Sequence, residues 1–250
     1  MDLGISNQVI IITGGGGGIG SEAARAFAAE GCKVVVWDLD IAKAKRVADS
    51  IRDNGGQAID VGGSVANSED VEAAVRRVIK EFNDIHILVN NAGFGDDAPL
   101  VEMTNEQWHR VIDVCLTGSF YCSRAVAPYM IKQKYGRIIN VASRAHLGGL
   151  LNRANYSAAK AGMLGLSRET ALELAEHNIT VNTVHPGMVP TDRLRGLAAY
   201  PQLKEGAERL QMIKRLATPS DIVNAILFFA SARTSFITGD QLYVTGGRYG

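Results

Sequence analysis

Tyr156 and Lys160 are the two side chains whose types and spacing most directly predict chemistry. They are four residues apart on a predicted helix, so both project from one face, about 6 Å apart along the axis. A free phenol has a pKa near 10 and is a poor base at neutral pH. A neighbouring ammonium stabilises the phenolate, and lowering the pKa by about three units requires roughly 4 kcal/mol. Tyr156 would then exchange a proton with a substrate oxygen.

Ser143 is the third candidate, because it follows a predicted strand at residues 137–141. Its hydroxyl would donate a hydrogen bond to the same substrate oxygen and steady the charge that develops there. An isolated Tyr-x-x-x-Lys pair is also typical of an ordinary amphipathic helix, with the tyrosine packed and the lysine solvated. The serine just upstream, together with a glycine-rich motif near the N-terminus, favours the catalytic interpretation.

That glycine-rich motif runs from Thr13 to Gly20 as Thr-Gly-Gly-Gly-Gly-Gly-Ile-Gly. It follows the first predicted strand and begins the first predicted helix. Glycines let the backbone turn tightly and approach a pyrophosphate, whose charge the amide groups of the helix N-terminus then meet. The alternative phosphate motif, G-x-x-x-x-G-K-[ST], is excluded because Ser21 stands where its lysine would be. The run predicts dinucleotide binding.

Asp38 ends the second predicted strand, 18 positions after Gly20. A carboxylate near this spacing holds the hydroxyls of the adenosine ribose. A 2′-phosphate would meet like charge there, and neither Gly17 nor Leu39 supplies a basic side chain to offset it. Asp38 therefore favours NAD over NADP, although a solvated residue at a strand end would look the same in the sequence.

The elements that must position these residues alternate along the chain. Short β-branched runs at 9–12, 33–37, 86–89, 137–141 and 180–184 predict strands, with weaker ones at 57–60 and 241–244. Between them, apolar residues at spacings of three and four predict helices at 19–30, 41–54, 68–82, 105–132, 154–177 and 220–232. Thr104 is the predicted N-cap of the fourth helix, with Gln107 three residues later.

This order predicts an α/β fold with a doubly wound, Rossmann-like parallel sheet of about seven strands and helices on both faces. Strands that are apolar without alternation agree, since they are buried on both faces. The composition shows no break, so we expect a single domain over residues 1–250. Residues 191–216 interrupt the alternation and are rich in Arg, Lys and Glu, which predicts an inserted lid over the substrate site.

The composition excludes several classes of function. The chain has 26 basic and 26 acidic residues, so a nucleic acid or an anionic membrane is not the expected partner. Three scattered cysteines and five scattered histidines predict neither a disulfide framework nor a metal site. The first residues lack a secretory signal, and no apolar run approaches the ~20 residues that span a bilayer. We expect a cytoplasmic protein.

The chain resembles the short-chain dehydrogenase/reductase family over essentially its whole length. Six motifs, in the same order along the chain as in the family, carry this resemblance. Besides the glycine loop, Ser143 and Tyr156-x-x-x-Lys160, they are Asp60-Val61, Asn90-Asn91-Ala92-Gly93 and Pro186-Gly187 followed by Thr191. The resemblance implies that Lys160 also binds the nicotinamide ribose, with Ser143, Tyr156 and Lys160 as the catalytic residues. It implies a cofactor site formed by Thr13, Gly14, Gly18, Ile19, Gly20, Asp38, Leu39, Asp60, Val61, Asn90, Ala92, Gly93, Tyr156, Lys160, Pro186, Gly187, Val189 and Thr191.

Cys115 departs from the family pattern, which usually has an asparagine at this position. In the family this asparagine is associated with a water in a proton relay from the lysine to solvent. A thiol is only a weak donor and acceptor. Either the relay is slower or rerouted through the Cys115 carbonyl, or the chain is a degenerate member. The intact Ser143, Tyr156 and Lys160 favour activity.

The leading hypothesis is an NAD-dependent alcohol dehydrogenase or carbonyl reductase that interconverts a small or medium secondary alcohol and its ketone. The alternatives are a 3-oxoacyl-type reductase that uses NADPH and a non-catalytic NAD-binding regulatory or scaffold protein. The resemblance also implies a homotetramer. The expected substrate-binding residues are Ser143, Ala145, His146, Arg153, Tyr156 and Met188.

Overall fold

The structure is a computed structural model that describes residues 2–148, 151–196 and 200–248. Within these residues seven strands form one parallel sheet in the order β3-β2-β1-β4-β5-β6-β7. The strands are β1 (Val9–Thr13), β2 (Lys33–Asp38), β3 (Gln57–Gly62), β4 (Ile87–Asn90), β5 (Gly136–Val141), β6 (Ile179–Pro186) and β7 (Gln241–Val244). The strand order reverses between β1 and β4, and the ends of the strands there form the crevice in which such folds bind ligands.

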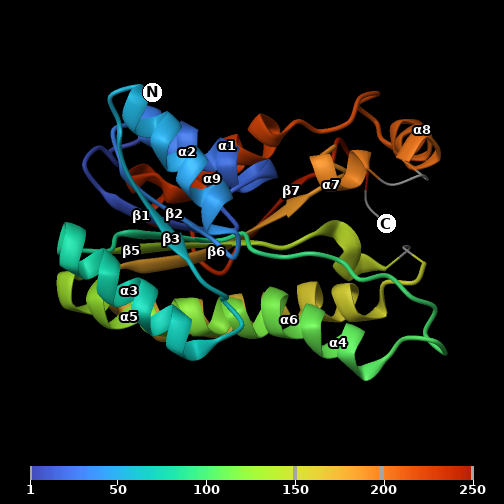
Figure 1. Ribbon diagram of the computed structural model, residues 1–250, viewed down its shortest axis with the longest axis horizontal. Coiled ribbons are helices and arrows are strands. Elements are labelled where there is room, and N and C mark those ends of the chain that lie inside the picture. The colour runs from blue at the N-terminus through green and yellow to red at the C-terminus, as the bar shows by residue number, and fades with distance from the viewer. Residues whose placement is uncertain (1, 149–150, 197–199, 249–250) are drawn as a thin grey trace.

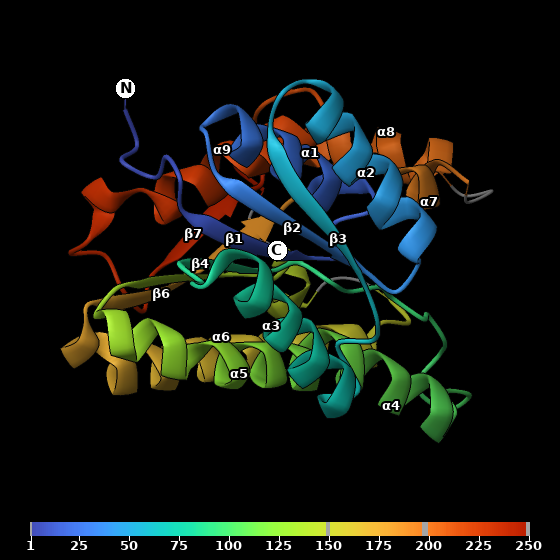
Figure 2. The ribbon, with the colours of Figure 1, turned by 60° about the vertical axis from the view of Figure 1, so that its left-hand side comes forward.

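Helices cover both faces of the sheet (Figures 1 and 2). One layer contains α1 (Gly18–Ala29), α2 (Ile41–Asp53) and α9 (Pro219–Ala230). The other contains α3 (Ser68–Phe82), α4 (Asn105–Ile112), α5 (Gly118–Gln133) and α6 (Ala154–Leu174). Alternate residues of β1 pack against the two helix layers. Ile10 and Ile12 lie in the apolar cluster with α1, and Val9 and Ile11 lie in the cluster with α3 and α5. This confirms the predicted fold class.

The predicted helix over residues 105–132 is confirmed as helical throughout, but it is not one regular α-helix. A wide π-helical turn, Asp113–Thr117, separates α4 from α5 and places Cys115 at its centre. The apolar spacing continues through this turn, so the sequence pattern does not reveal it. The capping box of Thr104 and Gln107 at the start of α4 is confirmed. Single π turns inside α-helices are frequent at functional sites, and this one lies beside the catalytic candidates.

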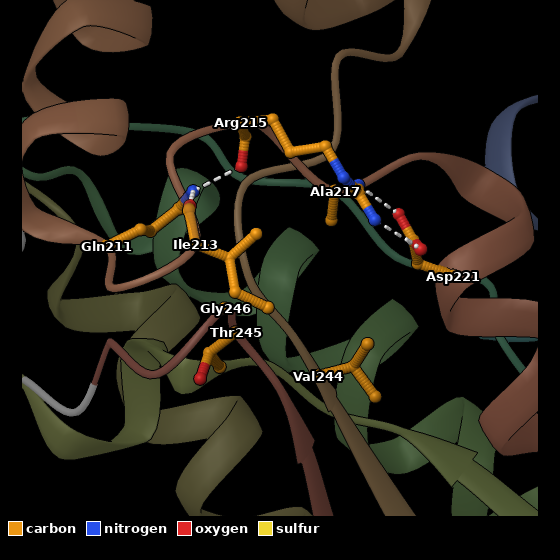
Figure 3. A pocket seen from close by; sticks show the side chains of 8 residues that line it. All are labelled: Gln211, Ile213, Arg215, Ala217, Asp221, Val244, Thr245 and Gly246. Carbon is orange, nitrogen blue, oxygen red and sulfur yellow. Dashed lines mark hydrogen bonds and ion pairs between the residues drawn. The ribbon is translucent and has the colours of Figure 1, made fainter.

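The predicted lid contains two short helices, α7 (Asp192–Arg195) and α8 (Tyr200–Leu210), which project beyond the sheet (Figure 1). After α8 the chain returns to the end of β7, where the N–H groups of Met212 and Ile213 both donate to the Gly246 carbonyl. A pocket here is lined by residues from this segment, α9 and β7 (Figure 3). At its rim Arg215 binds both carboxylate oxygens of Asp221, at 2.6 and 2.9 Å, which anchors the segment to α9.

Across the three described ranges, no helix combines the length and the hydropathy that crossing a membrane requires.

Candidate active site

Tyr156 and Lys160 lie on the same face of α6, as their spacing predicts. The Lys160 Nζ is 5.7 Å from the centre of the Tyr156 ring. The lysine is 2% exposed, and its ammonium donates a 2.7 Å hydrogen bond to the carbonyl of Val141 at the end of β5. A buried ammonium held on one side by a carbonyl keeps its position beside the tyrosine ring.

Ser143 follows β5 by two residues, in extended backbone. Its Oγ accepts a hydrogen bond from the N–H of Ala145, which begins the 3₁₀ turn Arg144–Leu147 packed on α6. In this hydrogen bond the Ser143 oxygen is the acceptor, so the hydroxyl proton is left to be donated to a substrate oxygen. The end of β5 therefore brings Ser143 to the same region as Tyr156 and Lys160.

Asn155 positions Tyr156, and the sequence analysis did not single it out. The side chain is fully buried, and its Nδ2 donates to the carbonyls of Asp96 at 2.9 Å and Gln107 at 3.1 Å. Its Oδ1 accepts from the N–H of Tyr156 at 2.7 Å. The residue thereby ties the first turn of α6 to α4 and to the loop after β4. The only signal in the sequence was an asparagine directly before the motif tyrosine.

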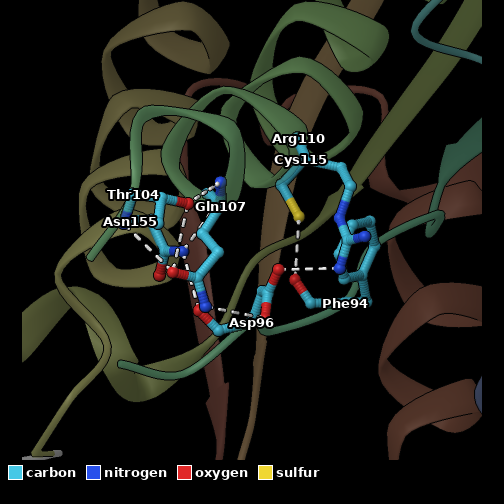
Figure 4. A network of polar contacts seen from close by, with 7 residues as sticks. All are labelled: Phe94, Asp96, Thr104, Gln107, Arg110, Cys115 and Asn155. Carbon is cyan, nitrogen blue, oxygen red and sulfur yellow. Dashed lines mark hydrogen bonds and ion pairs between the residues drawn. The ribbon is translucent and has the colours of Figure 1, made fainter. Parts of the chain in front are cut away.

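The loop after β4 forms a polar network with α4 (Figure 4). The Arg110 guanidinium donates to Asp96 at 2.7 Å and lies 5.4 Å from the centre of the Phe94 ring. The Phe94 carbonyl accepts a weak hydrogen bond from the thiol of Cys115, at 3.6 Å. These contacts hold the wall of the site that faces the Tyr156 helix.

Cys115 lies beside Lys160, at the position where the family usually has asparagine. A Cβ placed on Gly93 would lie 3.2 Å from the Cys115 Sγ and 3.4 Å from the Lys160 Nζ, so both groups border the same glycine. The thiol is fully buried, and the Cys115 carbonyl accepts from the Ser119 hydroxyl at 3.1 Å.

The glycine loop leaves a cradle of bare backbone at the start of α1. The N–H of Gly16 donates to the Asp38 Oδ2 at 2.9 Å, which joins the loop to the end of β2. A Cβ at Gly20 would lie 2.1 Å from the Gly14 carbonyl oxygen, and one at Gly18 would lie 3.0 Å from the Thr191 side chain. A side chain at Gly17 would meet nothing within 4 Å. The loop backbone is therefore accessible from solvent at Gly17 and closely packed against the protein at Gly20, so a pyrophosphate could approach its amide groups.

Thr13 and Asn91 connect this loop to the turn after β4. The Thr13 hydroxyl accepts from the N–H groups of Asn91 and Ala92, both at 3.0 Å. In return, the Asn91 amide donates to the carbonyls of Thr13 and Gly14. These bonds fix the two βα turns that lie on either side of the crevice.

The remaining cofactor candidates lie around the same crevice. Leu39 is 77% exposed beside Asp38, and Val61 pairs with Trp37 across β2 and β3. Asp60 is 3.7 Å from the Arg52 guanidinium. The Asn90 side chain instead points into the core and donates to Asn140 at 2.8 Å, which leaves only its backbone near the crevice. Gly187 donates its N–H to the Val244 carbonyl, and Val189 is buried in the apolar cluster that includes residues of α1.

The expected substrate-binding residues differ in their exposure and in whether their polar atoms already have partners in the protein. Arg153 pairs with Asp97 at 2.8 Å, which joins the loop before α6 to the loop after β4. Both ring nitrogens of His146 already have partners, Ser143 and Tyr243. Ala145 is fully buried, and Met188 is partly exposed after β6. Contact of these residues with a substrate stays a prediction.

Comparison with known proteins decides the family. A family model described as "Enoyl-(Acyl carrier protein) reductase" matches residues 14–248, nearly the whole chain. The chain belongs to the short-chain dehydrogenase/reductase family. It is an oxidoreductase of this family, and the predicted resemblance is confirmed.

Two relatives match over almost their full length. A 3-oxoacyl-[acyl-carrier-protein] reductase of Synechocystis is 41% identical over 245 residues, 97% of each chain. The (2S)-[(R)-hydroxy(phenyl)methyl]succinyl-CoA dehydrogenase subunit BbsD of Thauera aromatica is 38% identical over 250 residues, 98% of each chain. Among solved structures, a 7α-hydroxysteroid dehydrogenase complexed with NADH and 7-oxoglycochenodeoxycholic acid superposes with a TM-score of 0.95 at 34% identity. That match covers 100% of this chain and 97% of the other.

Proposed function

We propose that this protein interconverts a 3-oxoacyl thioester and its 3-hydroxyacyl form, with NAD(H) as the coenzyme. The observation that best supports this chemistry is the position of Lys160, which contacts both Tyr156 and the end of the strand that leads to Ser143. This proposal keeps the hydride-transfer chemistry that the sequence predicted. It replaces the small alcohol or ketone of the leading hypothesis with the acyl substrate of its alternative.

The chain's own residues would perform the proton chemistry. The bound dinucleotide supplies or accepts the hydride at the nicotinamide. In the reduction direction, Ser143 donates a hydrogen bond to the ketone oxygen, and Tyr156 delivers a proton to it. Lys160 stabilises the phenolate that remains, because its ammonium is held close to the ring. In the oxidation direction the same phenolate removes the alcohol proton.

Asp38 supports NAD(H) as the coenzyme. Its carboxylate lies at the end of β2 and accepts the Gly16 N–H, which places a negative charge at the rim of the glycine cradle. That charge suits ribose hydroxyls and repels a 2′-phosphate. The related 7α-hydroxysteroid dehydrogenase was solved with NADH, which agrees with this choice.

The acyl substrate is supported by the names of the relatives. The Synechocystis and Thauera proteins, which match almost end to end, are both named for acyl groups attached to a carrier protein or to coenzyme A. Residues 191–216, with α7 and α8, would form the substrate-binding lid, anchored at its far end by the Arg215–Asp221 pair. We propose that the enzyme works in the cytoplasm.

We also propose the homotetramer that the resemblance implies. Apolar side chains remain exposed on the outer surfaces of α5 and α6, among them Phe120, 40% exposed, and Leu172, 74% exposed. Burying such side chains between subunits would remove them from water. Sedimentation at micromolar concentration should give four times the monomer mass, and a pure monomer would contradict this.

The absorbance of the reduced coenzyme at 340 nm tests the substrate and the coenzyme together. The enzyme should oxidise NADH with acetoacetyl-CoA faster than with unactivated ketones such as cyclohexanone, and NADPH should be the poorer donor. Faster turnover of the simple ketones would support the small alcohol or ketone that the sequence analysis put first. Coenzyme binding without turnover of either class would support the non-catalytic alternative.

A further inference from the structure

Two histidines meet at the main-chain carbonyl of Ser143. The His146 Nδ1 lies 2.6 Å from this oxygen, and the His185 Nδ1 lies 3.2 Å from it. The two rings are 4.4 Å apart between centres. A carbonyl oxygen only accepts hydrogen bonds, so both Nδ1 atoms carry a proton in this arrangement.

The register of the sheet builds this cluster. His185 of β6 pairs with Tyr243 of β7, and their rings stack with centres 4.4 Å apart and planes 12° apart. Gln241 precedes Tyr243 by two residues, so both point to the same face of the sheet. The Tyr243 hydroxyl lies 2.9 Å from the His146 Nε2, and the Gln241 Oε1 lies 3.1 Å from the His185 Nε2.

The partner of each Nε2 bears on which tautomer the ring adopts, and the partner of His146 favours the one it needs. With its proton on Nδ1, a neutral imidazole has an acceptor at Nε2. The Tyr243 hydroxyl can donate to that atom of His146. At His185 the facing atom is the Gln241 Oε1, which only accepts, so a neutral Nδ1–H ring there requires the Gln241 amide to turn by 180° and present its NH₂ to Nε2. Burial lowers the pKa of His185 to about 4, so this ring is neutral at pH 7. With the amide so turned, both rings offer their Nδ1–H to Ser143.

The backbone alone holds the Ser143 carbonyl weakly. The N–H of His146 lies 3.5 Å from it, at the limit of a hydrogen bond. The two imidazoles supply the shorter contacts, one from the 3₁₀ turn after β5 and one from β6. A carbonyl fixed from two elements also fixes the plane of its peptide, which is one of the two peptides that meet at the Ser143 Cα and together set the direction of its Cα–Cβ bond.

We propose that His146 and His185 are positioning residues that hold the Ser143 carbonyl and thereby aim the Ser143 hydroxyl at the substrate oxygen. The inference rests on the role proposed above for Ser143. It assigns the two histidines a function through the serine and requires neither to touch the substrate. Small displacements of a catalytic group have large effects on rate, so the loss of this hold should lower kcat.

Replacing each histidine by asparagine and by leucine tests the proposal. The Asn Nδ2 occupies the position of the His Nδ1 and keeps the donor, whereas leucine keeps bulk and removes it. We expect kcat to fall roughly tenfold in His146→Leu and His185→Leu, and to return to within about threefold of wild type in the asparagine variants. The dissociation constant of NADH should change less than about twofold in all four. Equal kcat values for the leucine and asparagine variants would overturn the proposal.

His86 provides a matched control, since it is a partly buried histidine whose Nδ1 accepts from the N–H of Val9 at the other end of the sheet. His86→Leu should lower the melting temperature and leave kcat unchanged. His185 is fully buried, so if its leucine variant does not fold, the half-buried His146 pair decides the question.

Ser143→Ala separates this proposal from the proposed function. Wild-type turnover in Ser143→Ala would show that the assigned function of the serine is wrong. An inactive Ser143→Ala with wild-type kcat in His146→Leu would show that only the positioning proposal is wrong.

Discussion

The ammonium of Lys160 lies 5.7 Å from the centre of the Tyr156 ring, while its Nζ donates at 2.7 Å to the Val141 carbonyl. One side chain thus joins the helix that carries the tyrosine to the strand that leads to Ser143. The relationship is built from a spacing of four residues on α6 and from the position of β5 beside it.

Removing the carboxylate of Asp38 should change the choice of coenzyme. The wild-type enzyme should have a kcat/KM for NADH at least about tenfold higher than for NADPH, because the carboxylate repels the 2′-phosphate. Asp38→Ala should bring the two values within about threefold of each other. Asp40→Ala is the control, because Asp40 caps α2 through the N–H groups of Ala42 and Lys43. A wild-type enzyme that prefers NADPH would refute the assignment.

Restoring asparagine at Cys115 should speed turnover if the missing side chain slows the proton relay. The thiol contacts the Phe94 carbonyl at only 3.6 Å, and an amide would donate there more strongly. We expect Cys115→Asn to raise kcat about two- to fivefold and Cys115→Ala to leave it unchanged. Steady-state rates between pH 6 and 9 are the measurement. Identical pH profiles for all three proteins would mean that the side chain at this position is irrelevant.

Burial of His185 makes the stability of the protein depend on pH. The pKa of this ring is lowered from 6.5 to about 4, first because burial disfavours its charged form. In the unfolded chain the histidine takes up a proton near its ordinary pKa, so its contribution to stability is complete above about pH 6.5. The contribution is lost as the pH falls toward 4.

Chemical denaturation at pH 7.5, 6.0 and 5.0 measures this effect. The free energy of unfolding of the wild type should fall more steeply over this range than that of His185→Asn, which has no imidazole to titrate. Parallel slopes for the two proteins would show that the ring is not held neutral in the folded state.

Local patterns in the sequence predicted most of the elements and the positions of the main site residues. The strands of β-branched residues, the cap at Thr104 and the helical spacing of Tyr156 and Lys160 each depend on neighbours in the chain. The π turn at Cys115 could not be predicted, because five residues are too few to distinguish its period from that of an α-helix. The contacts of Asn155 and of the His146–His185 pair join distant elements, so they follow from the register of the sheet and the packing of α4 on α6.

The central claim is that the Tyr156 hydroxyl exchanges the proton while the rest of the site binds the coenzyme. Turnover of Tyr156→Phe, measured beside its NADH affinity by fluorescence titration, tests this most directly. The account predicts a kcat at least ~10³-fold below wild type, because the acid–base group is gone, with an NADH dissociation constant within about twofold of wild type. A phenylalanine variant that binds NADH and turns over at the wild-type rate would contradict it.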